Sequence, residues 1–205
     1  MKYFNWFILI TFSLLTSGCA VKQLEQNYSL SKDSTETVFV MGVKSKNTDI
    51  SADRFKLLMW PSDIHSDAYK IEDMWKNAAH YDFPENGYIV SSATGNDHVA
   101  FKSIELYSKD KKSIITQKRI CQGQKGPIFY LPRGKVVYLG DINLKFSHGR
   151  IEYYMTKDFK SAKSFIDNHY PKLRGRLQQT NINMLYSSTP CIEPQLEYIP
   201  LYIPM

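Results

Sequence analysis

Short runs of hydrophobic residues, separated by glycine, proline and polar turns, occupy most of the chain. Residues 36–43, 87–93 and 114–121 are rich in the β-branched and aromatic residues that favour pleated, half-buried strands. The most regular block spans residues 127–155, where several such runs follow one another at short intervals. Closely spaced short strands with Gly and Pro turns are typical of β-sandwiches and barrels. The pattern therefore predicts a mainly β domain over residues 36–205.

The spacing of the hydrophobic residues changes near residue 157. From there they recur at intervals of three and four, as on one face of a helix: Phe159, Ala162, Phe165, Ile166 and Tyr170. Thr156 or Asp158 can cap the start of this helix by accepting a backbone hydrogen bond, and Pro171 cannot continue it. We predict one C-terminal amphipathic helix at about residues 157–169, packed against the sheet.

Residues 62–86 follow a predicted strand that ends at Pro61, and they form a polar stretch without regular spacing. Binding residues lie on loops more often than in cores. We therefore name His65, Trp75 and Tyr81 as a candidate ligand loop, in which the two aromatic rings would stack on a ligand.

The first residues of the chain have the order of a secretory signal. Lys2 precedes a short apolar run, and the small residues Thr16, Ser17 and Gly18 follow it. The apolar run is too short for a comfortable membrane span, which needs about 20 residues. The segment is therefore predicted to direct export of the chain.

Residues 15–19, Leu-Thr-Ser-Gly-Cys, resemble the lipobox of bacterial lipoproteins. The resemblance implies that residues 1–18 are a cleaved signal peptide and that Cys19 becomes the lipidated first residue. Many lipoproteins with Asp after this cysteine stay on the inner membrane, so Ala20 implies transport to the periplasmic face of the outer membrane. Residues 19–35 are polar and rich in Ser and Gln, as in a flexible tether. An ordinary signal peptide with a chance cysteine and an uncleaved anchor are the alternatives.

Cys121 and Cys191 remain once Cys19 is assigned to lipid. An even number of cysteines in an oxidising compartment favours pairing. We therefore predict a disulfide between Cys121 and Cys191. Two buried free thiols, or pairing with another chain, are the alternatives.

Residues 189–205 contain four prolines, which fix the backbone and remove hydrogen-bond donors. We predict an extended tail whose apolar residues either lie in a groove of the same domain or contact a partner. The whole chain has a formal net charge of +6. This modest excess favours contact with anionic headgroups or envelope polymers. Nucleic acid is not predicted as a partner, because no basic run is long enough to require it.

The sequence lacks the motifs of common catalytic sites. It has no His-Glu-x-x-His metal motif, no Gly-x-Ser-x-Gly elbow and no complete phosphate-binding loop. Asp141, Glu152 and Asp158 could in principle pair as acid and base, as in glycosidases. Solvated strand and helix faces are the better interpretation of these three carboxylates. We predict no enzyme activity, no metal and no cofactor.

Three short motifs in the second half of the chain add a further resemblance. They are Leu131-Pro132-Arg133-Gly134, then Tyr138-Leu139-Gly140, then a helix that closes at Tyr170-Pro171. Together they resemble a group of uncharacterised small lipoproteins of Gram-negative bacteria. The resemblance implies an immunoglobulin- or transthyretin-like antiparallel β-sandwich, and it implies no catalytic residue.

These features together predict a lipid-anchored protein of the cell envelope that acts as a non-catalytic structural or interaction module. Its partners would be the membrane, through the N-terminal lipid, and another envelope protein. The alternative is a periplasmic lipoprotein that binds a small ligand or a glycan through residues 62–86. A third hypothesis is an envelope hydrolase with an unrecognised site.

Overall fold

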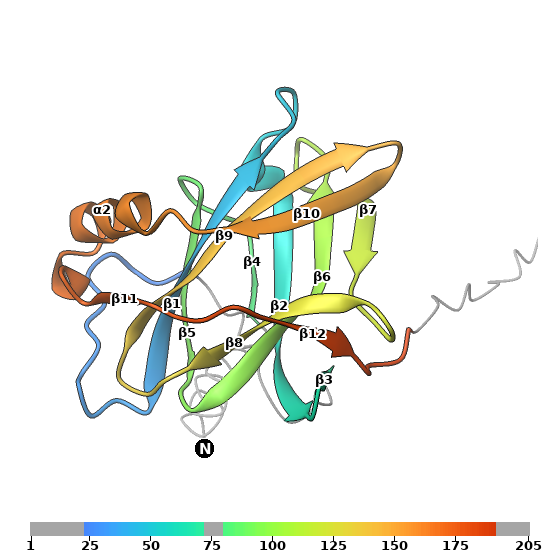
Figure 1. The fold of residues 1–205 in the computed structure, drawn as a ribbon. Helices are drawn as coiled ribbons and strands as arrows, with labels where there is room; N and C mark the ends of the chain where they lie inside the picture. The colour runs from blue at the N-terminus through green and yellow to red at the C-terminus, as the bar shows by residue number, and fades with distance from the viewer. Residues whose placement is uncertain (1–22, 72–79, 192–205) are drawn as a thin grey trace, which may run out of the picture.

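The computed structural model describes residues 23–71 and 80–191. These residues form a mainly β domain, as the sequence predicted, and their single α-helix lies at one side of it (Figure 1). The strands are β1 (Glu36–Ser45), β2 (Phe55–His65), β3 (Ala68–Ile71), β4 (His80–Asp82), β5 (Tyr88–Thr94), β6 (Asp97–Tyr107), β7 (Ile114–Arg119), β8 (Lys125–Leu131), β9 (Val136–Ser147), β10 (Arg150–Thr156), β11 (Leu177–Gln179) and β12 (Asn183–Ser187). The helix is α2 (Phe159–His169), and the 3₁₀ helices are η2 (Ala52–Arg54) and η3 (Pro171–Leu173).

The first sheet has the strand order β10-β9-β1-β5. The long strand β9 pairs with β11 through residues 136–138 and with β10 through residues 141–147. β1 runs parallel to β9 and antiparallel to β5. Gly140 lies where the register between β1 and β9 shifts, and its φ of 107° is a conformation that residues with a side chain rarely adopt.

The strand pairings of the second sheet close on themselves. β2 pairs with β3, β3 with β12, β12 with β8, β8 with β6, and β6 again with β2, so five strands form a ring. β4 adds to the ring at β2, and β7 adds to it at β6. The second sheet is therefore a small closed barrel with two extra strands.

The predicted immunoglobulin- or transthyretin-like antiparallel sandwich is not confirmed. A closed ring takes the place of one open sheet, and three pairings are parallel: β1 with β9, β11 with β9, and β12 with β3. β12 closes the ring by pairing Tyr186 with Ala68, a residue more than 100 positions earlier. The hydrophobic pattern predicts where strands form, but it does not say which distant strands will pair.

β1 is buried on both faces because the first sheet lies between two apolar layers. Phe39, Met41 and Val43 pack into the core between the two sheets. Val38 and Val40 face the opposite way and pack in the cluster that includes α2. Side chains alternate between the faces of a strand, so residues 37–43 are buried without a break.

α2 lies where the sequence predicted a helix. The Asp158 side chain caps its start by accepting a hydrogen bond of 3.1 Å from the backbone N–H of Ser161. Ala162 and Ile166 are its buried residues, and they pack on the first sheet. The helix ends before Pro171, which has no N–H to continue it.

The prediction of an irregular stretch after Pro61 was wrong for part of its length. β2 continues through Pro61 to His65, and residues 68–71 return beside it as β3. On the same side of β2, residues 57–59 pair with β4. Pro61 lies in the gap between these two pairings, where the missing N–H of a proline is tolerated.

Candidate functional site

The structure places the two described members of the predicted ligand loop far apart. His65 is the last residue of β2 and is exposed beside the turn to β3. The backbone of Tyr81 belongs to β4, where it pairs with Leu58, seven residues before His65 and about 23 Å away along the strand. Trp75 and Cys19 lie outside the described residues. The described part of the stretch does not form one loop around a ligand, because it adds to β2 as strands.

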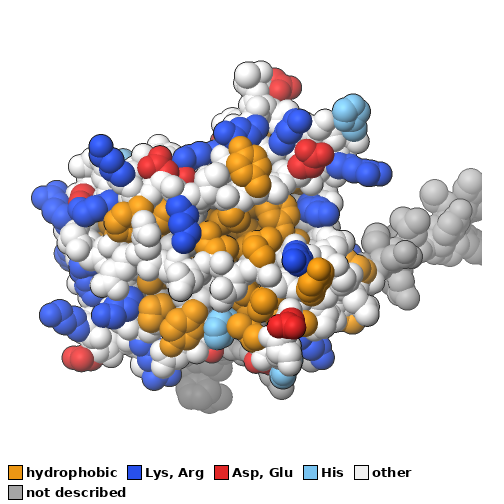
Figure 2. All heavy atoms as spheres, in the orientation of Figure 1, with side chains coloured by type: hydrophobic (Ala, Val, Ile, Leu, Met, Phe, Trp, Pro, Cys, Tyr) orange, Lys and Arg blue, Asp and Glu red, His pale blue; other side chains and the backbone are white. Residues whose placement is uncertain are grey.

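A surface groove lies instead between the edge of the first sheet and the second sheet. It has a volume of about 560 Å³. Its lining comes from β7, β8, β10, β12 and the turn before β8: Lys118, Gln124, Lys125, Tyr153, Tyr154, Met155 and Met184. Figure 2 shows hydrophobic side chains at the centre of this face, between β10 and β12, with lysine and arginine side chains around them. We call this hollow the β10 groove.

A second hollow of about 310 Å³ extends the groove along β10 toward the hairpin. Its lining is Thr116, Gln117, Lys118, Gly149, Arg150, Ile151 and Glu152. Lys118 lines both hollows. Among the described residues, β10 pairs only with β9, and β7 pairs only with β6. Both hollows therefore follow strand edges that have no described partner.

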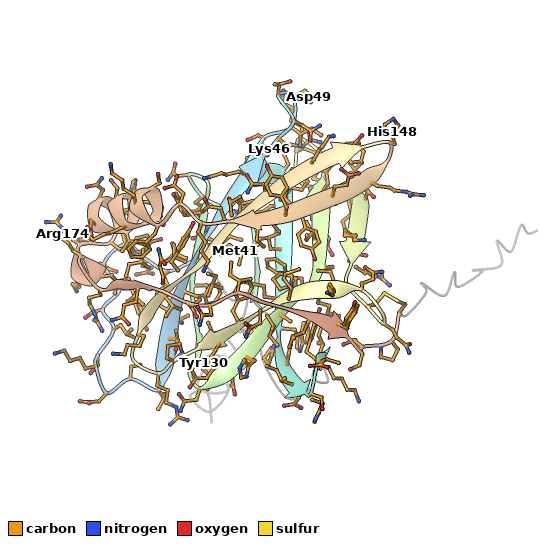
Figure 3. All side chains as sticks on the ribbon, in the orientation of Figure 1. Met41, Lys46, Asp49, Tyr130, His148 and Arg174 are labelled. Atoms are coloured by element: carbon orange, nitrogen blue, oxygen red, sulfur yellow. A yellow bond between two sulfur atoms is a disulfide. The ribbon has the colours of Figure 1, made fainter. Side chains whose placement is uncertain are left out.

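The β9–β10 hairpin places β10 at the edge of the first sheet. Its two-residue loop consists of His148 and Gly149, which have positive φ values of 51° and 76°. Positive φ at both positions is the geometry of the type I′ turn, whose twist matches that of the strands it joins. Figure 3 shows His148 at the tip of this hairpin. The local sequence Ser-His-Gly-Arg therefore forms the tight turn that places β10 beside β9 at the edge of the sheet.

Aromatic and sulfur-containing side chains are exposed along the groove. Tyr154 is 51% exposed, Tyr186 49% and Met184 46%. The ammonium of Lys125 lies 4.8 Å from the centre of the Tyr186 ring, and that of Lys46 lies 5.9 Å from the centre of the Tyr154 ring. Cations at these distances are attracted to the faces of the rings. Exposed apolar side chains that gather on one part of the surface indicate a contact surface.

Tyr153 connects the two sides of the groove. Its hydroxyl donates a hydrogen bond of 3.3 Å to the backbone oxygen of Lys125. Burial of the ring, together with nearby Tyr69, raises the pKa of Tyr153 to about 12. The phenol is therefore neutral at physiological pH and acts as a donor, not as a base.

The charges that line the groove are mainly positive. Lys118 and Lys125 line the larger hollow, whose lining contains no acidic residue. Arg150 and Glu152 add one charge of each sign in the smaller hollow. An anionic or acidic partner is therefore favoured along the whole groove.

A separate group of polar residues is buried inside the first sheet. Asp141 is fully buried; it accepts a hydrogen bond of 2.5 Å from the hydroxyl of Tyr138 and one of 2.6 Å from the ammonium of Lys44. The Tyr138 hydroxyl in turn accepts a hydrogen bond of 2.9 Å from the backbone N–H of Asp158. The hydrogen bond to Asp141 raises the pKa of Lys44. Burial and the same carboxylate raise the pKa of Tyr138.

This network connects β1, β9 and the start of α2, so its role is structural. The prediction that Asp141 lies on a solvated face was wrong, since Lys44 and Tyr138 satisfy its charge inside the sheet. A Cβ atom at Gly42 would overlap the Asp141 carboxylate, so the glycine makes room for it. Lys44 also lies 3.7 Å from Asp158, but Asp141 itself has no exposed surface with which to contact a substrate.

The predicted disulfide is present in the structure. Cys121 and Cys191 are bonded, with their Cα atoms 5.1 Å apart and a sequence separation of 70. Two backbone hydrogen bonds support the same junction: from Gln122 to Thr189 at 2.7 Å, and from Ser187 to Gln124 at 2.8 Å. The disulfide therefore holds the end of the described chain beside the turn that lines the β10 groove.

The groove was not predicted from the sequence, although the sequence contains one signal of it. Most exposed strands have apolar residues on one face only. In residues 150–155, Ile151, Tyr153 and Met155 alternate toward one face, while Tyr154 places a second aromatic ring on the other. Large apolar side chains on both faces of a strand next to a tight turn indicate an edge strand with a contact surface.

Within residues 23–71 and 80–191, no helix is both long and apolar enough to cross a membrane. The same residues contain no group of three or more His, Cys, Asp or Glu side chains that could hold a metal ion. Comparisons with family models, with curated proteins and with solved structures found no match to this chain.

Proposed function

We propose that this protein is a non-catalytic interaction module of the cell envelope, and that the β10 groove is its contact surface. In this proposal, lipid on Cys19 holds the domain at the periplasmic face of the outer membrane. The observation that supports it best is the edge of β10 that no described strand pairs with, which is bordered by exposed Tyr154 and by Lys118 and Lys125. An unpaired strand edge offers backbone hydrogen bonds to an extended segment of another protein.

The composition of the groove supports a protein partner. Tyrosine and methionine are enriched at protein interfaces, and a few aromatic residues usually supply most of the binding energy. Lys118 and Lys125 favour acidic side chains in the partner and would exclude a basic one. The partner is therefore an envelope protein with an extended, acidic and partly apolar segment.

The N-terminal segment sets where this contact takes place. The tether predicted for residues 19–35 is shorter in the structure, because most of it packs on the domain: the backbone N–H of Leu24 donates a hydrogen bond of 2.9 Å to Val90, and Leu30 is buried. The proposal therefore leaves only residues 19–22 between the lipid and the domain. The groove would then work close to the membrane surface, within reach of other anchored proteins. Cys19→Ala removes the proposed lipid and is expected to move the protein from the membrane fraction to the soluble fraction. Unchanged fractionation would contradict the anchor.

Crosslinking in intact cells tests the contact surface. Tyr154→Ala is expected to lower capture of the partner by about tenfold or more, because a central aromatic residue often contributes 2 kcal/mol or more to binding. Tyr130→Ala is the matched control: Tyr130 is 43% exposed but lies near the other end of β8 (Figure 3). Equal capture by both variants and the unchanged chain would contradict the proposal.

A glycan-binding role is the second candidate, and the exposed rings of Tyr154 and Tyr186 favour it. Exposed aromatic rings provide stacking surfaces for sugars, and the lysines would attract an acidic one. Calorimetric titration with polygalacturonate, and with neutral dextran as the control, separates this role from the first. Binding of polygalacturonate that Tyr186→Ala abolishes would favour the glycan, whereas no heat with either polymer favours the protein partner.

A further inference from the structure

The described chain begins at the edge of the first sheet that lies opposite β10. The Gln23 side chain donates a hydrogen bond of 3.0 Å to the backbone oxygen of Phe83 and another of 3.0 Å to that of Tyr88. It accepts one of 3.1 Å from the backbone N–H of Val90 in β5. β5 and β10 are the two end strands in the order β10-β9-β1-β5 (Figure 1). The chain therefore joins the domain at the edge farthest from the β10 groove.

Only residues 19–22 separate this edge from the proposed lipid on Cys19. Four residues span at most about 14 Å, even when they are fully extended. The surface around Gln23 and Phe83 is therefore held close to the bilayer in the lipidated chain. Its chemistry decides whether it touches the headgroups.

Apolar side chains and lysines gather around Phe83. The Phe83 ring packs edge-on against the Tyr107 ring at 5.1 Å, and Ile114, which pairs with Tyr107 across the β6–β7 hairpin, is 50% exposed. The ammonium groups of Lys56 and Lys111 lie 5.1 Å and 4.9 Å from the centre of the Phe83 ring. Aromatic and aliphatic side chains bordered by lysines are typical of protein surfaces at a membrane interface. We call these five residues the Phe83 cluster.

Basic side chains outnumber acidic ones in and beside the Phe83 cluster. The basic residues are Arg54, Lys56, Lys109, Lys111 and Lys112. Of the described side chains there, the exposed acidic ones are Asp53, Glu85 and Asp110. Groups of basic residues held at a membrane surface are attracted to anionic phospholipids. This surface therefore favours an anionic bilayer over a neutral one.

We propose that the Phe83 cluster contacts the anionic phospholipid headgroups of the membrane that holds the protein, and that the β10 groove faces away from this membrane. The orientation rests on the lipid anchor of the proposed function. Three strand spacings of about 4.8 Å, or about 14 Å in all, separate β5 from β10 within the sheet. An envelope protein can then reach the groove while the opposite edge stays on the bilayer.

Co-sedimentation with vesicles tests the membrane contact without the lipid anchor. The full mature chain with Cys19→Ala is mixed with vesicles of phosphatidylethanolamine and phosphatidylglycerol, or with vesicles of phosphatidylcholine alone. It should bind the anionic vesicles more tightly by about tenfold or more, since one lysine at an anionic surface contributes about a factor of five. No preference for the anionic vesicles would overturn the proposal.

Two double variants with the same change in net charge separate the cluster from the charge of the whole domain. Lys56→Glu with Lys111→Glu should lower the affinity for anionic vesicles by about tenfold or more. Lys135→Glu with Lys145→Glu changes two exposed lysines away from the cluster and should lower it by no more than about twofold. Thermal unfolding checks that both variants are folded. Equal losses of affinity would overturn the proposal.

Paramagnetic relaxation, measured by NMR, tests the orientation of the lipidated chain. The unchanged mature chain is placed in bicelles in which some lipid headgroups carry a gadolinium chelate. Relaxation should be fastest at the amides of Phe83 and Lys111, and slowest at those of Tyr154 and Met184 in the groove. Equal relaxation at the two edges of the sheet, or faster relaxation in the groove, would overturn the proposal.

Failure of the membrane contact is distinguishable from failure of the proposed function. The vesicle test does not need lipid on Cys19, and the crosslinking test of Tyr154→Ala does not depend on how the domain is oriented. Unchanged capture of the partner by Tyr154→Ala would contradict the groove alone. Equal binding to both kinds of vesicle would contradict the Phe83 cluster alone.

Discussion

β1 and β10 belong to the same sheet but have opposite surroundings. β1 has a strand on each side and an apolar layer on each face, so Phe39 and Val38 are both completely buried. β10 has one described strand partner, and Tyr154 on it is half exposed. Even the charge near β1, on Asp141, is enclosed by hydrogen bonds. The centre of the sheet therefore stabilises the fold, and its edge is left available for contact.

The largest expected effect is a loss of free energy of unfolding when a buried aromatic residue of β1 is removed, compared with removal of an exposed one of β10. Phe39→Ala leaves a cavity in the core between the sheets and should lower the free energy of unfolding by about 4 kcal/mol. Tyr154→Ala removes a half-exposed ring and should cost less than about 1 kcal/mol. Urea unfolding of both variants measures the difference. Similar losses would mean that β10 belongs to the stabilising core.

The disulfide is expected to have the next largest effect. Replacing both Cys121 and Cys191 with serine frees a loop of about 70 residues in the unfolded chain and should cost about 3 kcal/mol. Since the bond joins segments outside β1 and β9, amides of those two strands should remain the slowest to exchange. Thermal unfolding and hydrogen exchange of the double variant check both points. Faster hydrogen exchange at the amides of β1 than at those of β12 would contradict this prediction.

The buried tyrosine gives the centre of the sheet a dependence on alkaline pH. Burial and the hydrogen bond to Asp141 raise the pKa of Tyr138 above its ordinary 10.0, so the folded chain keeps a proton that the unfolded chain loses. This contribution to stability is complete below about pH 10 and is lost as the pH rises further.

Tyr138→Phe should therefore make the fall of stability between about pH 10 and pH 11 less steep, although the variant is less stable at neutral pH. Urea midpoints measured across this pH range check the prediction. Identical slopes for the unchanged chain and Tyr138→Phe would contradict it.

The smallest effect is expected from a charge in the groove. Lys118→Glu should change the free energy of unfolding by no more than about 0.5 kcal/mol, because a solvated surface charge contributes little to stability. Lys112→Glu, in the exposed turn before β7, is the control and should behave alike. Thermal unfolding of the two variants measures the change in their free energy of unfolding. A clearly larger loss in Lys118→Glu would show that the edge also supports the fold.

Much of the local structure could be predicted from the sequence. Alternating apolar residues indicated most of the strands, and the spacing of Ala162 and Ile166, with the cap at Asp158, indicated α2. The pairing of Cys121 with Cys191 followed from counting cysteines. The extension of β2 past Pro61 was missed, because a proline usually ends a strand unless its missing N–H falls where no partner is needed.

The candidate site could not be predicted in the same way. The residues of the β10 groove come from β7, β8, β10 and β12, which are brought together only by pairings such as Tyr186 with Ala68. The predicted ligand loop does not form one site, because His65 and the backbone of Tyr81 lie at different points along β2. Asp141 appeared to be a surface carboxylate because its cationic partner, Lys44, lies on a different strand 97 residues away in the sequence.

By itself, the sequence determined which segments become strands, where the helix starts and stops, and which faces are apolar. These properties depend on side chains a few residues apart. Only the tertiary structure decided that five strands close into a ring, that β1 is enclosed and that β10 pairs on one side only within residues 23–71 and 80–191. Every strand offers the same backbone donors and acceptors, so the choice of partners depends on how the whole chain packs.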